Sequence, residues 1–135
     1  MKRYLLDSGI ASDFVNARGT VRARVMDAAR AGQRIGLGTP ILGELIGGVM
    51  ASNDPARHLQ RLRQEIAGLR LWAFDAEAAS EYGKLYAELR AAGRLMQVPD
   101  MQLAAIARSL GNAVVVSKDR DLRAVPGIDV EDWSE

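Results

Sequence analysis

An unbroken apolar run, Ala113–Val116, constrains the fold of this chain more than any other feature. Three consecutive valines favour β structure, and a strand that is apolar at every position suits a parallel sheet covered on both faces. Arg3–Leu6 predicts a second short strand of this kind. Three further segments are strand candidates: Ile35–Leu37, Leu69–Phe74 and Ile128–Val130.

Longer stretches with apolar residues at helical spacing separate the strand candidates. Thr39-Pro40 and Asp54-Pro55 each place a capping side chain before a proline, which marks the start of a helix. We predict helical segments at residues 8–31 (broken near Gly19), 39–49, 55–67, 76–92 and 99–110. The alternation predicts a single α/β domain over residues 1–135, with a short, mostly parallel sheet and helices on both faces.

Composition removes several kinds of chemistry. The chain has no cysteine, which excludes disulfides, cysteine zinc sites and thiol nucleophiles. Its one histidine, His58, excludes paired-histidine zinc motifs and argues against a Ser-His-Asp triad. Carboxylates, amines, hydroxyls or a hard metal ion must therefore do any chemistry that the protein performs.

Charge and hydropathy say less about partners. The 18 basic and 17 acidic residues leave a net charge of +1, so any binding of nucleic acid would depend on a local basic patch. The apolar stretch after Met1–Arg3 stops at Asp7, which is too short for a signal peptide. No other stretch approaches the ~20 apolar residues of a membrane-spanning helix. We therefore expect a cytoplasmic protein.

Four acidic residues occupy positions that favour a common site. Asp7 directly follows the first strand, and Asp119 follows the valine strand after a two-residue step. If these strands are neighbours, both acids lie at the carboxyl edge of the sheet, where sites gather in parallel α/β folds. Glu44 lies within an apolar helical segment, and Asp100 lies in the first turn of a helix. Each acid also has a structural interpretation, as a cap, a dipole-complementing residue or a helix-rim residue.

The chemistry of such a cluster depends on a cation. Carboxylates that lie close together repel, and their pKa values rise unless a cation intervenes. Mg²⁺ and Mn²⁺ prefer oxygen ligands, lower the pKa of a bound water and stabilise charge on a phosphate. A cluster of acids without histidine or cysteine therefore indicates metal-assisted hydrolysis of phosphodiester bonds.

Five segments, in order along the chain, carry a resemblance to a known family. They read YLLDSGI at 4–10, TPILGEL at 39–45, DMQLAAIA at 100–107, VVVSKDRDL at 114–122 and VPGIDVEDW at 125–133. In these segments the chain resembles PIN-domain proteins, specifically the VapC-type toxins of VapBC toxin–antitoxin pairs.

The resemblance implies an RNA endonuclease that uses Mg²⁺ or Mn²⁺. It also implies inhibition by a VapB-type antitoxin and assembly as a homodimer or a toxin–antitoxin hetero-oligomer. By position, Asp7, Glu44 and Asp100 match the core metal-binding acids of the family. These three residues are the expected centre of the active site.

The segment after the valine strand matches the family less regularly. Asp119 matches the fourth acidic position, and Asp121 is the alternative for the same role. Ser117 stands where the family commonly has threonine, and its hydroxyl would orient a carboxylate or a water molecule. Gly9 replaces a common asparagine and Leu122 a frequent phenylalanine. Neither departure removes a carboxylate.

Two other functions are compatible with parts of the sequence. A phospho-receiver domain could use Asp75 and Lys118, but receivers have an acidic pair after the first strand, where Asp7 stands alone. A PIN-like module that binds RNA or a partner without cutting is the second alternative. The intact set of acids argues against it, because loss of at least one acid would mark an inactive relative.

Contacts to RNA and to a partner are the least constrained. Candidate RNA contacts are the arginines that follow the first helix and one that precedes Asp100: Arg18, Arg22, Arg24 and Arg94. We interpret a second group as a solvated helix face: Arg57, Arg61 and Arg63. The apolar helices between Thr39 and Ala67 are a candidate groove for an antitoxin segment, which would inhibit by placing an arginine or lysine among the acids.

Overall fold

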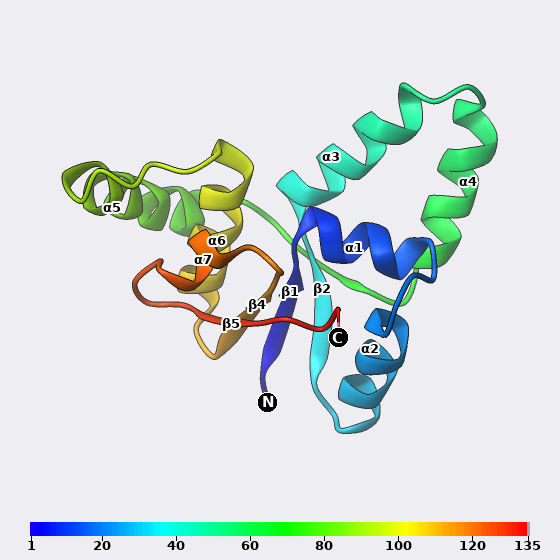
Figure 1. Cartoon of the computed structure of the whole chain (residues 1–135), viewed down its shortest axis with the longest axis horizontal. Coiled ribbons are helices and arrows are strands. Elements are labelled where there is room, and N and C mark those ends of the chain that lie inside the picture. Colours follow the sequence, from blue (N-terminus) through cyan, green and yellow to red (C-terminus); the bar gives the residue numbers. More distant parts are fainter. Residues whose placement is uncertain (135) are drawn as a thin grey trace.

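Five short parallel strands form the centre of the computed structural model, which describes residues 1–134 (Figure 1). They are β1 (Arg3–Leu6), β2 (Arg34–Gly38), β3 (Arg70–Trp72), β4 (Ala113–Val116) and β5 (Asp129–Glu131). Their order across the sheet is β3-β2-β1-β4-β5, and each neighbouring pair is parallel. The predicted α/β fold with a parallel sheet is confirmed.

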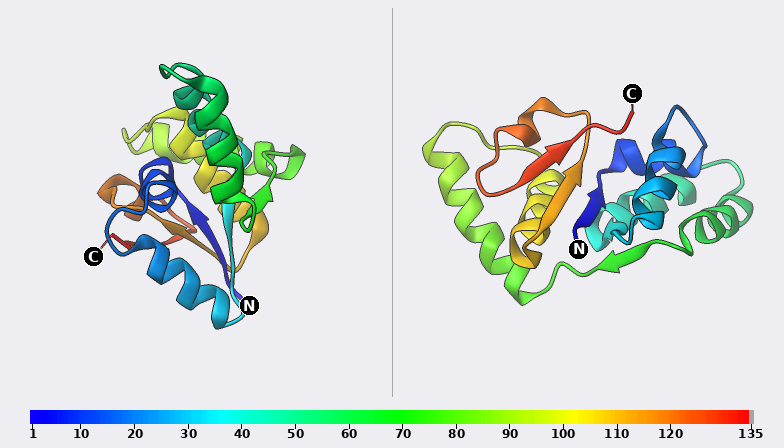
Figure 2. Two further views of the ribbon diagram at one scale, coloured as in Figure 1. Left: turned by 90° about the vertical axis from the view of Figure 1, so that its right-hand side faces the viewer. Right: turned by 90° about the horizontal axis from the view of Figure 1, so that it is seen from below.

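Seven helices connect the strands within the described residues. They are α1 (Ser8–Val15), α2 (Val21–Arg30), α3 (Thr39–Met50), α4 (Pro55–Ile66), α5 (Ala76–Ala91), α6 (Val98–Leu110) and α7 (Arg120–Arg123). Helix α2 lies on one side of the sheet, and α5 and α6 lie on the other (Figure 2). Every predicted helix is present, and the break near Gly19, whose φ is +60°, separates α1 from α2. Helix α7 was not predicted.

The two central strands are buried on both faces. In β1, Leu5 and Leu6 have no exposed surface, and the same is true of Val115 and Val116 in β4. This burial explains why the two segments are apolar at consecutive positions, since neither face of the sheet meets water there. The strongest sequence signals for strands therefore come from the pair that forms the middle of the sheet.

The order of the strands reverses beside β1. The chain moves from β1 to β2 and β3 in one direction, and then returns to place β4 on the other side of β1. Leu6 pairs in register with Val116, so the two strands end at the same level. Ligands in open parallel sheets bind at such a reversal, outside the carboxyl ends of the strands. Asp7 and Ser117 are the residues that follow these two ends.

Helices α3 and α4 pack against each other and project beyond the carboxyl edge of the sheet (Figure 1). Helix α3 begins directly after β2, at Thr39. Helix α1 also starts at this edge and contacts both α3 and α4. We call the pair formed by α3 and α4 the arm. Within residues 1–134, no helix has the combination of length and apolar character that crossing a membrane requires.

We predict that Gly36→Ala destabilises the protein. A Cβ atom at position 36 would lie 2.2 Å from the carbonyl oxygen of Arg70, a backbone atom of the neighbouring strand β3. Overpacking of this kind costs about 1–3 kcal/mol, which would appear as a lower free energy of unfolding in urea.

Gly47→Ala is the matched control. Nothing lies within 4 Å of a Cβ at this position in α3, and replacing a glycine within a helix by alanine stabilises by roughly 1 kcal/mol. Equal effects of the two substitutions would contradict the close approach of β2 and β3 at Gly36.

Candidate active site

Asp7 lies at the carboxyl end of β1, and its side chain has two separate partners. Its backbone N–H donates to the carbonyl of Val116 at 3.0 Å, which extends the pairing of β1 with β4. One carboxylate oxygen, Oδ1, accepts the backbone N–H of Ile10 at 2.8 Å and caps α1. The other, Oδ2, accepts a hydrogen bond from the hydroxyl of Ser117. Asp7 therefore caps α1 with one carboxylate oxygen, as expected, while Ser117 orients the other oxygen.

Ser117 links three strands at the edge of the sheet. It is the one buried polar residue among residues 1–134, with no exposed surface. Its hydroxyl donates to Asp7 and accepts the backbone N–H of Asp119 at 2.9 Å, while its own N–H donates to the carbonyl of Glu131 at 2.9 Å. Ser117 therefore fixes the position of Asp7 relative to Asp119.

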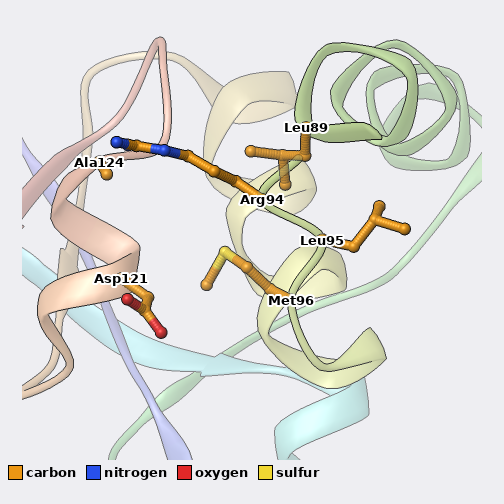
Figure 3. Close-up of a pocket in the computed structure, with 6 residues that line it drawn as sticks. All are labelled: Leu89, Arg94, Leu95, Met96, Asp121 and Ala124. Atoms are coloured by element: carbon orange, nitrogen blue, oxygen red, sulfur yellow. The ribbon is translucent and has the colours of Figure 1, made fainter. Parts of the chain in front are cut away.

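Asp119 begins the short helix that the sequence did not reveal. Its Oδ1 accepts the backbone N–H of Asp121 at 2.9 Å and caps α7. Asp121 follows in the first turn of that helix and is exposed. The carboxylate of Asp121 faces a neighbouring cavity at the end of α5 (Figure 3). The two alternatives for the fourth acidic position thus have different surroundings.

Asp100 shows that the predicted acids share one electrostatic environment. It lies in the first turn of α6 and is half-buried. Burial and, in decreasing order, the negative charges of Asp119, Asp7, Glu44 and Asp121 together raise the pKa of Asp100 to about 6. These four acids come from the end of β1, from α3 and from α7 with its N-cap, yet all act on this carboxyl group.

The pKa of Asp7 is also raised, chiefly by burial. The hydrogen bonds from Ser117 and Ile10 oppose the rise, whereas the charge of Asp119 adds to it and that of Lys118 lowers it. A half-buried acid beside other acids is unfavourable in its charged form. The site is therefore one that gains from a bound cation.

Glu44 lies at the margin of the site. Its side chain is exposed in α3, and it lines a groove of about 460 Å³ between α1 and the arm. Its charge still contributes to the raised pKa of Asp100. The interpretation of Glu44 as a helix-rim residue is compatible with this placement, since the rim of α3 faces the acids.

The donor set fits a hard divalent cation that keeps part of its water shell. The available groups are carboxylate and hydroxyl oxygens, which Mg²⁺ and Mn²⁺ prefer. In the part of the chain that the structure describes, no three acidic or histidine side chains are grouped closely enough to hold a metal ion together. Mg²⁺ is usually held by one or two carboxylates and several waters, so an open arrangement is suitable for it.

Lys118 lies beside the acids, a placement that the sequence did not predict, whereas Arg18 was already a candidate there. The Nζ atom of Lys118 lies 3.3 Å from Oδ2 of Asp13 in α1, and a guanidinium nitrogen of Arg18 lies 3.8 Å from the other oxygen of Asp13. The signal in the sequence was a single acid, Asp13, in an otherwise apolar and small helix. This pair of cations places positive charge at the border of the site.

Other predicted RNA contacts are engaged in packing. Arg22 donates to the carbonyls of Phe14 and Val15 and forms an ion pair with Glu65. The guanidinium of Arg24 lies over the ring of Trp133, 5.7 Å from its centre. Both arginines therefore have structural contacts away from the acids.

The remaining predictions for charged residues have mixed outcomes. Arg57 and Arg63 are exposed as expected, but Arg61 donates to the carbonyl of Val15 at 3.0 Å and thus ties α4 to α1. Asp75, the acid that a phospho-receiver would need, caps α5 by accepting the N–H of Ala78 at 3.0 Å.

Comparison with known proteins identifies the class to which this fold and site belong. Residues 4–128 match the family described as PIN domain. The chain belongs to the PIN-domain family.

Its relatives within that family are VapC proteins. The tRNA(fMet)-specific endonuclease VapC of Shigella flexneri is 36% identical over 93 residues, which cover 69% of this chain and 70% of the relative. The structure is similar to that of DNA-bound VapBC from Salmonella typhimurium, with a TM-score of 0.88, 30% identity, and coverage of 98% of this chain and 99% of the other. VapBC2 from Rickettsia felis, bound to a promoter DNA fragment, gives a TM-score of 0.90 at 23% identity, with 97% and 98% covered.

We predict that the metal-free protein loses stability as the pH rises from about 4 to about 6. The pKa of Asp100 is 3.8 when unperturbed and about 6 in the fold, so in this range the folded chain binds more protons than the unfolded chain. Stability falls with pH wherever the folded state holds the extra proton. Urea unfolding in EDTA at several pH values measures the effect.

Asp100→Asn should flatten this pH dependence, because the amide does not titrate. Asp54→Asn is the control: Asp54 caps α4 and is not among the acids that act on Asp100, so its variant should keep the wild-type slope. Parallel curves for wild type and Asp100→Asn would contradict the raised pKa.

Proposed function

We propose that the protein is a cytoplasmic endoribonuclease of the VapC type that hydrolyses RNA phosphodiester bonds with Mg²⁺ or Mn²⁺. The whole chain, residues 1–135, would serve as one catalytic domain. Relatives of this chain are named as endonuclease or ribonuclease VapC. The observation that carries the proposal is the raised pKa of Asp100, to which Asp7, Glu44 and Asp119 contribute from separate elements.

In this proposal Asp7, Asp100 and Asp119 would hold the ion, directly or through its water molecules, with Glu44 at the margin. The ion, when bound, lowers the pKa of its water and neutralises charge on the phosphate. Asp7 is oriented for this role because its two oxygens accept separate hydrogen bonds from Ile10 and Ser117. A bound cation would offset the acidic neighbours of Asp100 and favour its ionised form further.

The surroundings favour Asp119 over Asp121 as the fourth acid. Asp119 raises the pKa of both Asp7 and Asp100, and it is the largest of the charge contributions to Asp100. Asp121 acts on Asp100 alone and is the last of its named causes. Its carboxylate also faces the adjacent cavity (Figure 3). We therefore assign the fourth acidic position of the site to Asp119.

Lys118 is suited to hold a phosphate of the substrate. Its ammonium group is exposed by 55% and lies beside the acids, where it lowers the pKa of Asp7. The ion pair with Asp13 limits the directions in which the long side chain can extend. A lysine in this place would draw the negatively charged backbone toward a site that is otherwise acidic.

We further propose that a VapB-type antitoxin binds the groove between α1 and the arm. A solved structure of DNA-bound VapBC is similar to this structure. The lining of the groove includes the apolar side chains of Leu45, Val49 and Leu62 and the acid Glu44. A basic side chain of a bound segment could reach the acids from there, in place of the ion. A second groove, on the opposite side of the arm at Leu42 and Leu71, lacks such an acid.

The central test is cleavage of RNA by the purified, partner-free protein. We expect cleavage of a mixed structured RNA in Mg²⁺ or Mn²⁺ and none in EDTA. The rate of cleavage should fall by at least about 100-fold in Asp7→Asn, because this variant lacks a charge that binds the ion, and the ion stabilises negative charge on the phosphate. Gel analysis of end-labelled RNA measures all three.

The Asp54→Asn variant is the control, since this acid caps α4 and has no part in the proposed site. Equal cleavage by wild type and Asp7→Asn, or cleavage that persists in EDTA, would contradict the mechanism. No cleavage together with no heat of binding for Mn²⁺ in calorimetry would instead support a non-catalytic PIN-like module.

Ser117 supplies a second prediction. Loss of its hydroxyl in Ser117→Ala leaves Oδ2 of Asp7 without its donor, and changes to residues that orient a metal ligand reduce activity by about 10- to 100-fold. Ser117→Thr keeps the hydroxyl and should restore most of the rate. Identical rates for the alanine and threonine variants would show that the hydroxyl does not orient Asp7.

A further inference from the structure

A cavity of about 400 Å³ lies beside the candidate active site, between the end of α5, the segment that leads to α6, and α7 (Figure 3). Its lining combines apolar side chains with one base and one acid: Leu89, Leu95, Met96, Ala124, Arg94 and Asp121. Asp121 also acts on the pKa of Asp100. The cavity therefore opens next to the acids, and its size is suited to a small planar group.

One wall of the cavity is fixed by the end of α5. Gly93 has a φ of +66°, and the N–H of Arg94 donates to the carbonyl of Leu89 at 2.8 Å. The N–H of Gly93 donates to the carbonyl of Arg90 at 3.1 Å. These bonds form a Schellman-type helix end. The backbone of Arg94 is therefore held in place before any ligand binds.

The two charged residues of the cavity come from opposite sides and do not neutralise each other (Figure 3). Within residues 1–134, the guanidinium of Arg94 has no carboxylate within ion-pair distance and no hydrogen-bond acceptor. Met96 extends into the space between Arg94 and Asp121 (Figure 3). The cavity thus offers a fork of donors, a carboxylate acceptor and an apolar surface.

Guanine matches this arrangement better than the other RNA bases. Its O6 and N7 atoms accept two hydrogen bonds from an arginine fork. Its N1–H and N2–H groups, on the adjoining edge, can donate together to one carboxylate. Adenine lacks the O6 acceptor and the N1–H donor, and neither pyrimidine offers both a pair of acceptors for the arginine and a pair of donors for the carboxylate. Unpaired bases of RNA are read in this manner, splayed out of the stack.

We propose that the cavity is a subsite for an unpaired guanine next to the cleaved bond, and that Arg94 is its specificity-determining residue. The proposal rests on the proposed ribonuclease function. The phosphate would lie at the acids while the adjoining base enters the cavity beyond Asp121. Arg94 acts on the choice of the bond that is cut, whereas Asp7, Asp100 and Asp119 act on its hydrolysis.

The test compares Arg94→Met with Arg90→Met on short unstructured RNAs in which one position beside the cleaved bond is varied. Arg90 is exposed in the last turn of α5 and does not line the cavity. We expect wild type and Arg90→Met to prefer guanine over adenine by about tenfold or more, the discrimination of one bidentate pair. In Arg94→Met this ratio should fall close to one.

Two outcomes of the cleavage assay would overturn the proposal. One is a wild-type enzyme with no preference for guanine beside the bond. The other is an Arg94→Met variant that cleaves all substrates more slowly but keeps the preference, because uniform weakening indicates a phosphate contact.

A binding measurement separates this proposal from the proposed function. Protein labelled with ¹³C at its methionine methyl groups is titrated in EDTA with guanosine 5′-monophosphate and, separately, with adenosine 5′-monophosphate. We expect the Met96 signal to shift with the guanine nucleotide and not with the adenine nucleotide, and the shift to vanish in Arg94→Met.

The two assays together distinguish the failures. A Met96 shift without any cleavage of RNA would overturn the ribonuclease and leave the guanine subsite standing. Cleavage of RNA with neither a guanine preference nor a Met96 shift would overturn the subsite and leave the ribonuclease standing.

Discussion

The pairing of β1 with β4 is the constraint on which the rest of the site depends. It brings Leu6 level with Val116, so that Asp7 and Ser117 leave the sheet side by side. The buried hydroxyl of Ser117 then joins the carboxylate of Asp7 to the backbone of Asp119. A shift of this register would separate these groups, because Asp7 and Ser117 would no longer leave the sheet at the same level. The pairing of the two strands thus fixes the geometry of the acids.

The sequence predicted the centre of the sheet better than its edges. β1 and β4 have the bounds expected of them, because strands buried on both faces are apolar throughout. At the edges, β3 is confined to Arg70–Trp72 within the predicted Leu69–Phe74, and β5 begins one residue later than predicted, at Asp129. Edge strands pair on one side only, so their apolar pattern does not define their ends. Helix α7, of four residues, is too short to show helical spacing.

Some features of the candidate site could also be predicted from the sequence, whereas others depend on the tertiary structure. Acids at strand ends and at helix starts could be found from position alone, and the resemblance to PIN domains ordered them into one set. The convergence on Asp100 is a property of the tertiary structure, since it depends on elements more than ninety residues apart in the chain, from Asp7 to Asp119. The ion pair of Lys118 with Asp13 and the cavity at Arg94 also required the fold. The contacts of Arg22 with Glu65 and of Arg24 with Trp133 could not be predicted, because these partners are remote in sequence.

The late position of β4 has a consequence for how such a protein is made. The strand that completes the carboxyl edge is Ala113–Val116, and the residues that orient and accompany Asp7 follow it directly. A chain still growing on the ribosome has β1, β2 and the arm long before it has β4. Until that strand is inserted beside β1, Asp7 lacks its donor and Asp100 lacks its strongest neighbour. For a nuclease of the proposed kind, the acids therefore remain incompletely assembled in a nascent chain until β4 has been synthesised and has paired with β1.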